Sequence, residues 1–109
     1  MNLETAECIS SNNVTKQELI NAFQNDSGRG EYIILSKGEQ FYIQASEINN
    51  DSYVMEYREG DADHHFECVQ ELSKADVQLA FIKYLKEDDS WKIDFKWSQL
   101  KNKPWWRFW

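Results

Sequence analysis

The sequence predicts a small α+β domain in which two helices cover one face of an antiparallel β-sheet. Three observations lead to this fold class. The chain has 109 residues, which suits a single domain with one hydrophobic core. Two segments carry helix-capping residues followed by an apolar stripe. Between them lie four short segments rich in aromatic and β-branched residues, each separated from the next by turn residues.

The first helix is predicted over residues 15–26. Thr15 and Glu18 have the spacing of a capping box, in which each residue satisfies a backbone N–H of the other. Apolar side chains then follow at the spacing of one helix face: Leu19, Ile20 and Phe23. The sequence Ser27-Gly28-Arg29-Gly30 ends the pattern.

The four predicted strands cover residues 31–37, 40–46, 52–59 and 63–71. Their connections are short enough to keep neighbours paired, so we expect an antiparallel meander. Alternation assigns these side chains to the core face: Ile33, Leu35, Phe41, Ile43, Ala45, Tyr53, Met55, Tyr57, Phe66 and Cys68. It assigns these to the opposite face: Tyr32, Tyr42, Gln44, Glu56, Arg58, His65 and Glu67.

The second helix is predicted to begin after Ser73, a capping residue, and to run to about residue 87. Both helices need an apolar surface, so we expect both on one face of the sheet and the other face open to solvent. Residues 91–97 alternate apolar and polar side chains, which favours a closing Trp-rich strand, although a short helix also fits.

The chain is expected to divide into three parts. Residues 1–14 are polar and aperiodic, which is typical of a flexible N-terminal arm. Residues 15–100 form the single α+β domain. Residues 101–109 are a basic tail rich in tryptophan.

Composition narrows the classes of function. The net charge is −7, so the chain repels phosphate backbones and attracts cationic surfaces; a basic protein is a better partner than nucleic acid. Two cysteines without paired spacing indicate neither a disulfide framework nor a zinc site, and a reducing cytoplasm is the expected compartment. No apolar stretch is long enough to span a bilayer.

Carboxylates and aromatic residues fall together on the predicted open face. We expect a partner-binding patch there, in which carboxylates speed encounter and tyrosine anchors the bound state. Its members are Tyr42, Glu56, Arg58, Glu59, Asp61, Asp63 and Glu67. The alternative interpretation is a solvated surface that serves only solubility.

The sequence carries no motif for catalysis, so we expect a protein without catalytic residues, resident metal or cofactor. His64 and His65 are adjacent, and adjacent residues of a strand point to opposite sides. They are therefore expected to lie at a solvated hairpin end and not at a shared metal ion.

The tail ends in four aromatic residues within five positions. Candidate contact residues are Trp105, Trp106 and Trp109. Three fates are open: packing back on the domain, insertion into a groove of a partner, or contact with a membrane interface.

The layout resembles the small α+β immunity proteins of bacterial polymorphic-toxin systems. The resemblance covers residues 31–100 and is carried by four segments: Glu31-Tyr32-Ile33-Ile34-Leu35, Phe41-Tyr42-Ile43-Gln44-Ala45, Tyr53-Val54-Met55-Glu56-Tyr57, and Asp89-Ser90-Trp91 to Phe95-Lys96-Trp97. It implies a cytoplasmic inhibitor that binds a basic toxin domain and blocks its active site.

Two other classes of function stay open from the sequence. One is a membrane-peripheral or homo-oligomeric accessory protein that uses the tail or the open sheet face. The other is a small-ligand carrier or enzyme with a pocket between sheet and helices.

Overall fold

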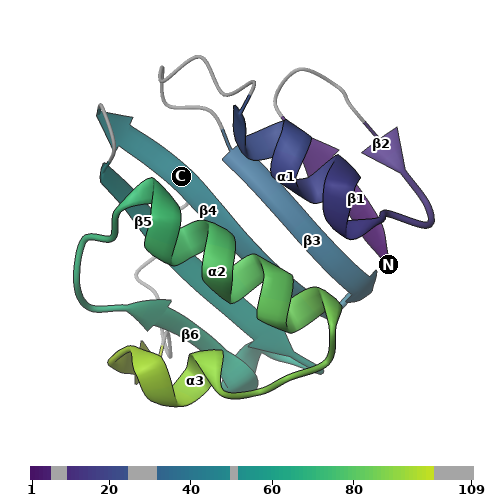
Figure 1. Ribbon diagram of the computed structural model, residues 1–109. Helices are drawn as coiled ribbons and strands as arrows, with labels where there is room; N and C mark the ends of the chain where they lie inside the picture. Colours follow the sequence, from purple (N-terminus) through teal and green to yellow (C-terminus); the bar gives the residue numbers. More distant parts are fainter. Residues whose placement is uncertain (6–9, 25–31, 50–51, 100–109) are drawn as a thin grey trace.

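The computed structural model describes residues 1–5, 10–24, 32–49 and 52–99, and its strands form a single sheet. The elements in chain order are β1 (Asn2–Thr5), β2 (Ser10–Ser11), α1 (Lys16–Gln24), β3 (Tyr32–Gly38), β4 (Phe41–Asn49), β5 (Ser52–Glu59), the 3₁₀ turn η1 (Ala62–His64), β6 (His65–Cys68), α2 (Lys74–Leu85), α3 (Trp91–Asp94) and β7 (Trp97–Gln99). The strand order is β2-β1-β3-β4-β5-β6-β7, and all neighbours pair antiparallel. Helices α1 and α2 lie across one face of this sheet (Figure 1).

The prediction of a four-stranded meander flanked by two helices is wrong, although the class is still α+β. Strands β3 to β6 do follow one another as a meander, but the sheet continues past both of its ends. β1 pairs with β3 at one side, and β7 pairs with β6 at the other. Residues 91–97, for which strand and helix were both open, divide between α3 and the start of β7.

Strand β1 corrects the prediction of a flexible arm over residues 1–14. Leu3 is only 1% exposed and lies opposite Leu35, and Val14 is also buried. The strand has four residues and a single large apolar side chain, so its sequence shows too little alternation to signal a strand. The tail, residues 101–109, lies outside the described residues.

Both predicted helices begin at their predicted caps. The Thr15 backbone N–H donates to Glu18 Oε1 at 3.1 Å, and the Glu18 backbone N–H donates to Thr15 Oγ1 at the same distance. Ser73 Oγ accepts from the backbone N–H of Asp76 at 3.2 Å. These bonds satisfy N–H groups that a helix start otherwise leaves unpaired.

A cluster of aromatic rings closes the core beneath α2. Trp91 is buried and meets Tyr57 edge-on, with 4.8 Å between ring centroids, and Trp97 edge-on at 5.7 Å. Trp97 Nε1 donates to the carbonyl of Lys92 at 3.1 Å, which joins β7 to α3. Burial, aided by the nearby Glu59 carboxylate, raises the pKa of Tyr57 to about 12.

Most of the predicted core face is buried beneath the helices, but Phe41 is 46% exposed. Its ring lies beside Gly60, where an added Cβ would come within 3.7 Å of it. Gly60 has φ +101°, a conformation that side-chain-bearing residues rarely adopt, and its N–H donates to the Gln40 carbonyl at 2.7 Å. Phe41 therefore covers the hairpin end of the sheet instead of the core.

Candidate functional site: the open face of the sheet

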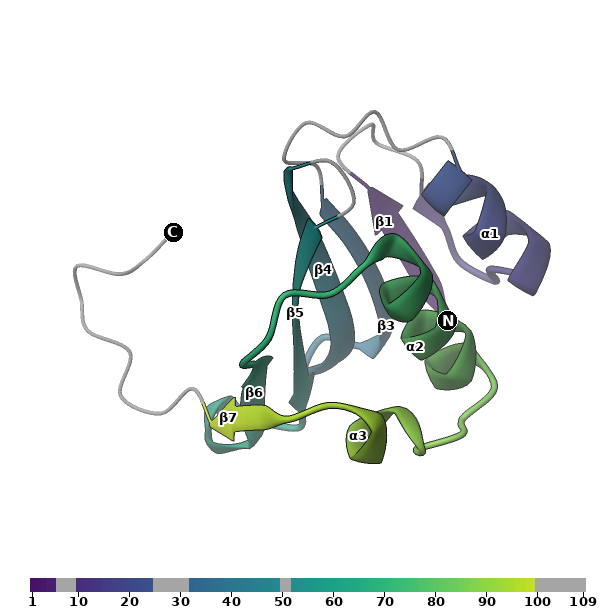
Figure 2. The same ribbon diagram turned by 60° about the vertical axis from the view of Figure 1, so that its left-hand side comes forward.

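The open face is the side of the sheet that no described helix covers (Figure 2). Each strand contributes alternate side chains to it, because residues paired directly opposite each other point to the same side. Its members are Asn2, Glu4, Tyr32, Ile34, Ser36, Tyr42, Gln44, Ser46, Ile48, Val54, Glu56, Arg58, His65, Glu67 and Ser98.

A polar row crosses three strands of the open face. Tyr42, Arg58 and His65 lie opposite one another on β4, β5 and β6. The Arg58 guanidinium donates from Nη1 to Gln40 Oε1 at 2.7 Å, and its Nη2 lies 3.3 Å from His65 Nδ1. The same guanidinium lies 6.0 Å from the centroid of the Tyr42 ring. These contacts fix the planes of all three side chains.

The contact with Arg58 also sets the proton of His65. A guanidinium can only donate hydrogen bonds, so Nδ1 must be the accepting, unprotonated nitrogen. Nε2 then carries the hydrogen and points toward Glu56 Oε1 at 3.4 Å, a distance within ion-pair range but without hydrogen-bond alignment. Burial raises the pKa of Tyr42 above its ordinary value; the Arg58 charge opposes that rise and the Glu56 charge adds to it. Tyr42 is therefore uncharged at neutral pH, and Glu56 has no lysine or arginine ion-pair partner among the described residues.

Two carboxylates lie directly opposite each other next to this row. Glu56 on β5 faces Glu67 on β6, an arrangement in which like charges repel. Among the described residues Glu67 has no ion-pair partner. A shallow concavity of about 40 Å³ lies between the two carboxylates and Gln44, Ser46 and Val54. This part of the face is anionic and can receive a cationic side chain.

The opposite end of the open face is apolar. Tyr32, Ile48 and Val54 are 37%, 49% and 36% exposed, around the small residue Ser46. Large apolar side chains that gather on an uncovered sheet face are typical of an interaction surface. The open face thus combines an apolar end with an anionic, ring-bearing centre.

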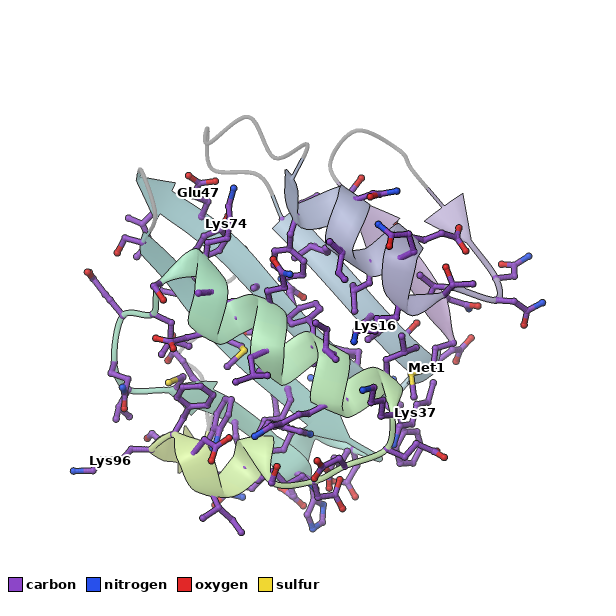
Figure 3. The ribbon with its side chains drawn as sticks, in the orientation of Figure 1. Met1, Lys16, Lys37, Glu47, Lys74 and Lys96 are labelled. Carbon is purple, nitrogen blue, oxygen red and sulfur yellow. The ribbon has the colours of Figure 1, made fainter. Side chains whose placement is uncertain are left out.

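No lysine is found among the described strand residues of this face. Lys16 belongs to α1, Lys74 and Lys83 to α2, and Lys92 to α3; the remaining three are Lys37, Lys86 and Lys96. Figure 3 looks onto the helix side and shows Lys16, Lys37 and Lys74 there, while Lys96 extends outward from the edge of the molecule.

The lysines on the helix side neutralise carboxylates near them. Lys83 Nζ lies 2.7 Å from Asp94, and Lys92 pairs with Glu59. Among its described strand residues the open face has one cation, Arg58, whose donors are directed at Gln40 and His65. Glu56 and Glu67 therefore have no lysine or arginine ion-pair partner among the described residues.

The structure brings together four of the seven residues predicted for the binding patch: Tyr42, Glu56, Arg58 and Glu67. Glu59 points to the helix side and pairs with Lys92. Asp61 and Asp63 lie in the connection from β5 to β6, where Asp61 Oδ1 accepts the backbone N–H groups of Asp63 and His64 at the start of η1. The sequence places these three close in number, but a strand end and a turn separate them from the open face.

His64 and His65 belong to different elements, because His64 is the last residue of η1 and His65 the first of β6, so strand alternation does not apply to this pair. His64 Nδ1 is 2.7 Å from Asp61 Oδ1 in the exposed turn, whereas His65 lies on the open face. The hydrogen bond and charge of Asp61 raise the pKa of His64. Among the described residues no three His, Cys, Asp or Glu side chains are grouped so as to hold a metal ion.

Sequence reasoning did not assign Glu4, Ile48 and Val54 to the candidate site. Glu4 lies on β1, which was not predicted, and pairs opposite Ile34. Ile48 lies beyond the predicted end of its strand at residue 46, whereas Val54 lies between the core residues Tyr53 and Met55, so alternation already placed it on the open side. Extending the alternation of β4 from Tyr42 to Ile48 assigns Ile48 to the open face.

Comparison of the chain with protein-family models, with curated proteins and with solved structures gives no significant match. None of the helices in the described ranges is long and apolar enough to cross a membrane.

Proposed function

We propose that the protein is a non-catalytic binding module that holds a basic protein partner on the open face of its sheet. The observation that carries this proposal is the distribution of cations. No lysine occurs among the described strand residues of the open face, while Glu4, Glu56 and Glu67 lie on it beside exposed apolar side chains. A surface of this kind attracts a cationic protein and retains it by apolar contact.

The same charges disfavour the other macromolecular partners. Phosphate backbones would be repelled by the carboxylates and by the net charge of −7. A second copy of the chain docked face to face would bring Glu56 and Glu67 of both copies together without a compensating cation, since Arg58 is engaged within its own row.

The resemblance to immunity proteins of polymorphic-toxin systems supports a narrower form of the proposal. In that form the partner is a toxin domain with a basic cleft, and the open face occupies the cleft. Carboxylates would take the positions of the toxin's anionic substrate, and the apolar end would supply contact area. The expected location is the cytoplasm, where such an inhibitor meets its toxin.

Selection from a random peptide library displayed on phage tests the binding chemistry without knowledge of the partner. The immobilised full chain is expected to enrich peptides that contain lysine or arginine next to aromatic or aliphatic residues. Their binding is expected to weaken as salt rises, because exposed charges are screened.

Two double variants with equal net charge locate the binding surface. Glu56→Lys with Glu67→Lys reverses the open face, and Glu87→Lys with Asp89→Lys makes the same change in charge on the exposed helix side. The selected peptides should lose affinity for the first variant only. Peptides without cation enrichment, or equal loss for both variants, would contradict the proposal.

A further inference from the structure

The sequence that follows β7 is complementary to the open face. Residues 101–109 contain the three cations Lys101, Lys103 and Arg107 and four large aromatic residues: Trp105, Trp106, Phe108 and Trp109. The open face offers carboxylates without a lysine and apolar side chains that are exposed. Cations with neighbouring aromatic rings are the chemistry that the proposed function assigns to the partner.

The attachment point of this segment lies on the same face. Ser98 pairs directly opposite Glu67, so β7 brings the chain to the border of the anionic centre. Four strand spacings separate β7 from β3, roughly 19 Å at the usual interval. Ten residues in extended form reach roughly 33 Å. Residues 100–109 are therefore long enough to cross the face from their own attachment point.

We propose that residues 101–109 are a ligand of the open face of their own molecule. Lys101, Lys103 and Arg107 meet the carboxylates of Glu56, Glu67 and Glu4, and the tryptophans cover the apolar end around Val54. The inference rests on the proposed function, because the same surface chemistry receives both ligands. The inference adds that the tail competes with an external partner, which binds the open face only after the tail has left it.

Covalent attachment gives the tail an advantage over an external ligand. A segment joined to the domain by a short connection has an effective concentration in the millimolar range, so a weak contact suffices for occupancy. If the tail covers the face for about nine-tenths of the time, the apparent affinity of a partner falls about tenfold.

Zero-length cross-linking tests the contact on the full chain. A carbodiimide couples a lysine amine to a carboxylate that lies against it, and mass spectrometry of the digested monomer identifies the joined pair. Lys83 to Asp94 and Lys92 to Glu59 are ion pairs of the described domain and serve as internal positive controls. We expect Lys101 or Lys103 joined to Glu67 or Glu56.

Mixing isotope-labelled and unlabelled protein before the reaction separates the two origins of a cross-link. Links within one label support the intramolecular ligand. Links that join the two labels would overturn it, because the tail would then bind another copy. Control links without any tail link to the open face would overturn it as well.

A second measurement distinguishes failure of this inference from failure of the proposed function. The variant Lys101→Glu, Lys103→Glu and Arg107→Glu keeps the open face intact, and its affinity for a peptide selected on the full chain should rise about tenfold. An unchanged affinity would reject the tail as competitor while the peptide still binds the face. Absence of any selected cationic peptide would reject the proposed function itself.

Discussion

Leu3 joins β1 to the hydrophobic core, and the variant Leu3→Ala measures what that strand contributes. The side chain is 1% exposed, and its strand pairs with β3 at four successive positions. Truncation of a buried leucine removes its transfer free energy and leaves a cavity, a loss of about 2–5 kcal/mol. Because β1 lies near the sheet edge and can relax, we expect a loss of about 3 kcal/mol in the free energy of unfolding.

Urea denaturation followed by tryptophan fluorescence measures this loss. With a slope of about 2 kcal/mol per molar urea, the midpoint should fall by about 1.5 M. The melting temperature of a domain of this size should fall by about 12–24 °C. Asn2→Ala, on the open side of the same strand, is the matched control and should stay within about 0.5 kcal/mol of the parent. A change at Leu3 no larger than that of the control would refute the placement of β1 in the core.

Three further predictions concern the turn, the exposed histidine and the carboxylate pair. Gly60→Ala should lower the free energy of unfolding by about 1 kcal/mol or more, because a residue with a side chain is strained at φ +101°. Gly38→Ala is the control and should have little effect, because a Cβ added there meets only ordinary contacts. Equal losses of stability in the two variants would contradict the strain argument. The pKa of the His64 ring, measured by NMR, should lie above 6.5 and return toward 6.5 in Asp61→Asn. The contribution of this pair to stability should be lost as pH rises through the raised pKa of His64, and also as pH falls through the lowered pKa of Asp61. An unchanged His64 titration in Asp61→Asn would show that Asp61 is not the cause. Glu67→Gln should raise stability by up to about 0.5 kcal/mol through relief of repulsion with Glu56, yet weaken binding of cationic peptides; a loss of stability would indicate that Glu67 has a structural partner.

The central part of the fold follows from local sequence signals. The capping pairs at Thr15 and Ser73 set the starts of two helices, and alternation from Tyr32 to Cys68 assigns most side chains to the correct face. The alternation signal is strong because it is repeated over several residues, and the capping signal is strong because it requires a second residue at a fixed spacing.

The edges of the fold could not be predicted in the same way. β1 has four residues and β7 has three, so their pairing is decided by tertiary contacts such as Leu3 with the core and Trp97 with Trp91. Periodicity also could not separate α3 from β7, because the side chains from Trp91 to Trp97 match both the helical period and the strand period of two. The backbone forms the helix α3 first and then enters the strand β7 at Trp97.

The candidate site was found by composition and corrected by geometry. Tyr42, Glu56, Arg58 and Glu67 share a face because their strands pair in register. Glu59 was misplaced because it is the last residue of β5 and alternates with Arg58, so that it lies on the helix side, where it pairs with Lys92 of α3. No sequence rule identifies that ion pair, since Lys92 and Glu59 are far apart along the chain.

The described strand residues of the open face carry Glu4, Glu56 and Glu67 against the single cation Arg58, so the local electrostatic potential over this face is negative. A basic partner that comes near this face is drawn toward it before contact. Association should therefore be fast at low ionic strength and slow as salt is added, while the lifetime of the bound complex changes little. Stopped-flow kinetics at several salt concentrations would separate these two rate constants.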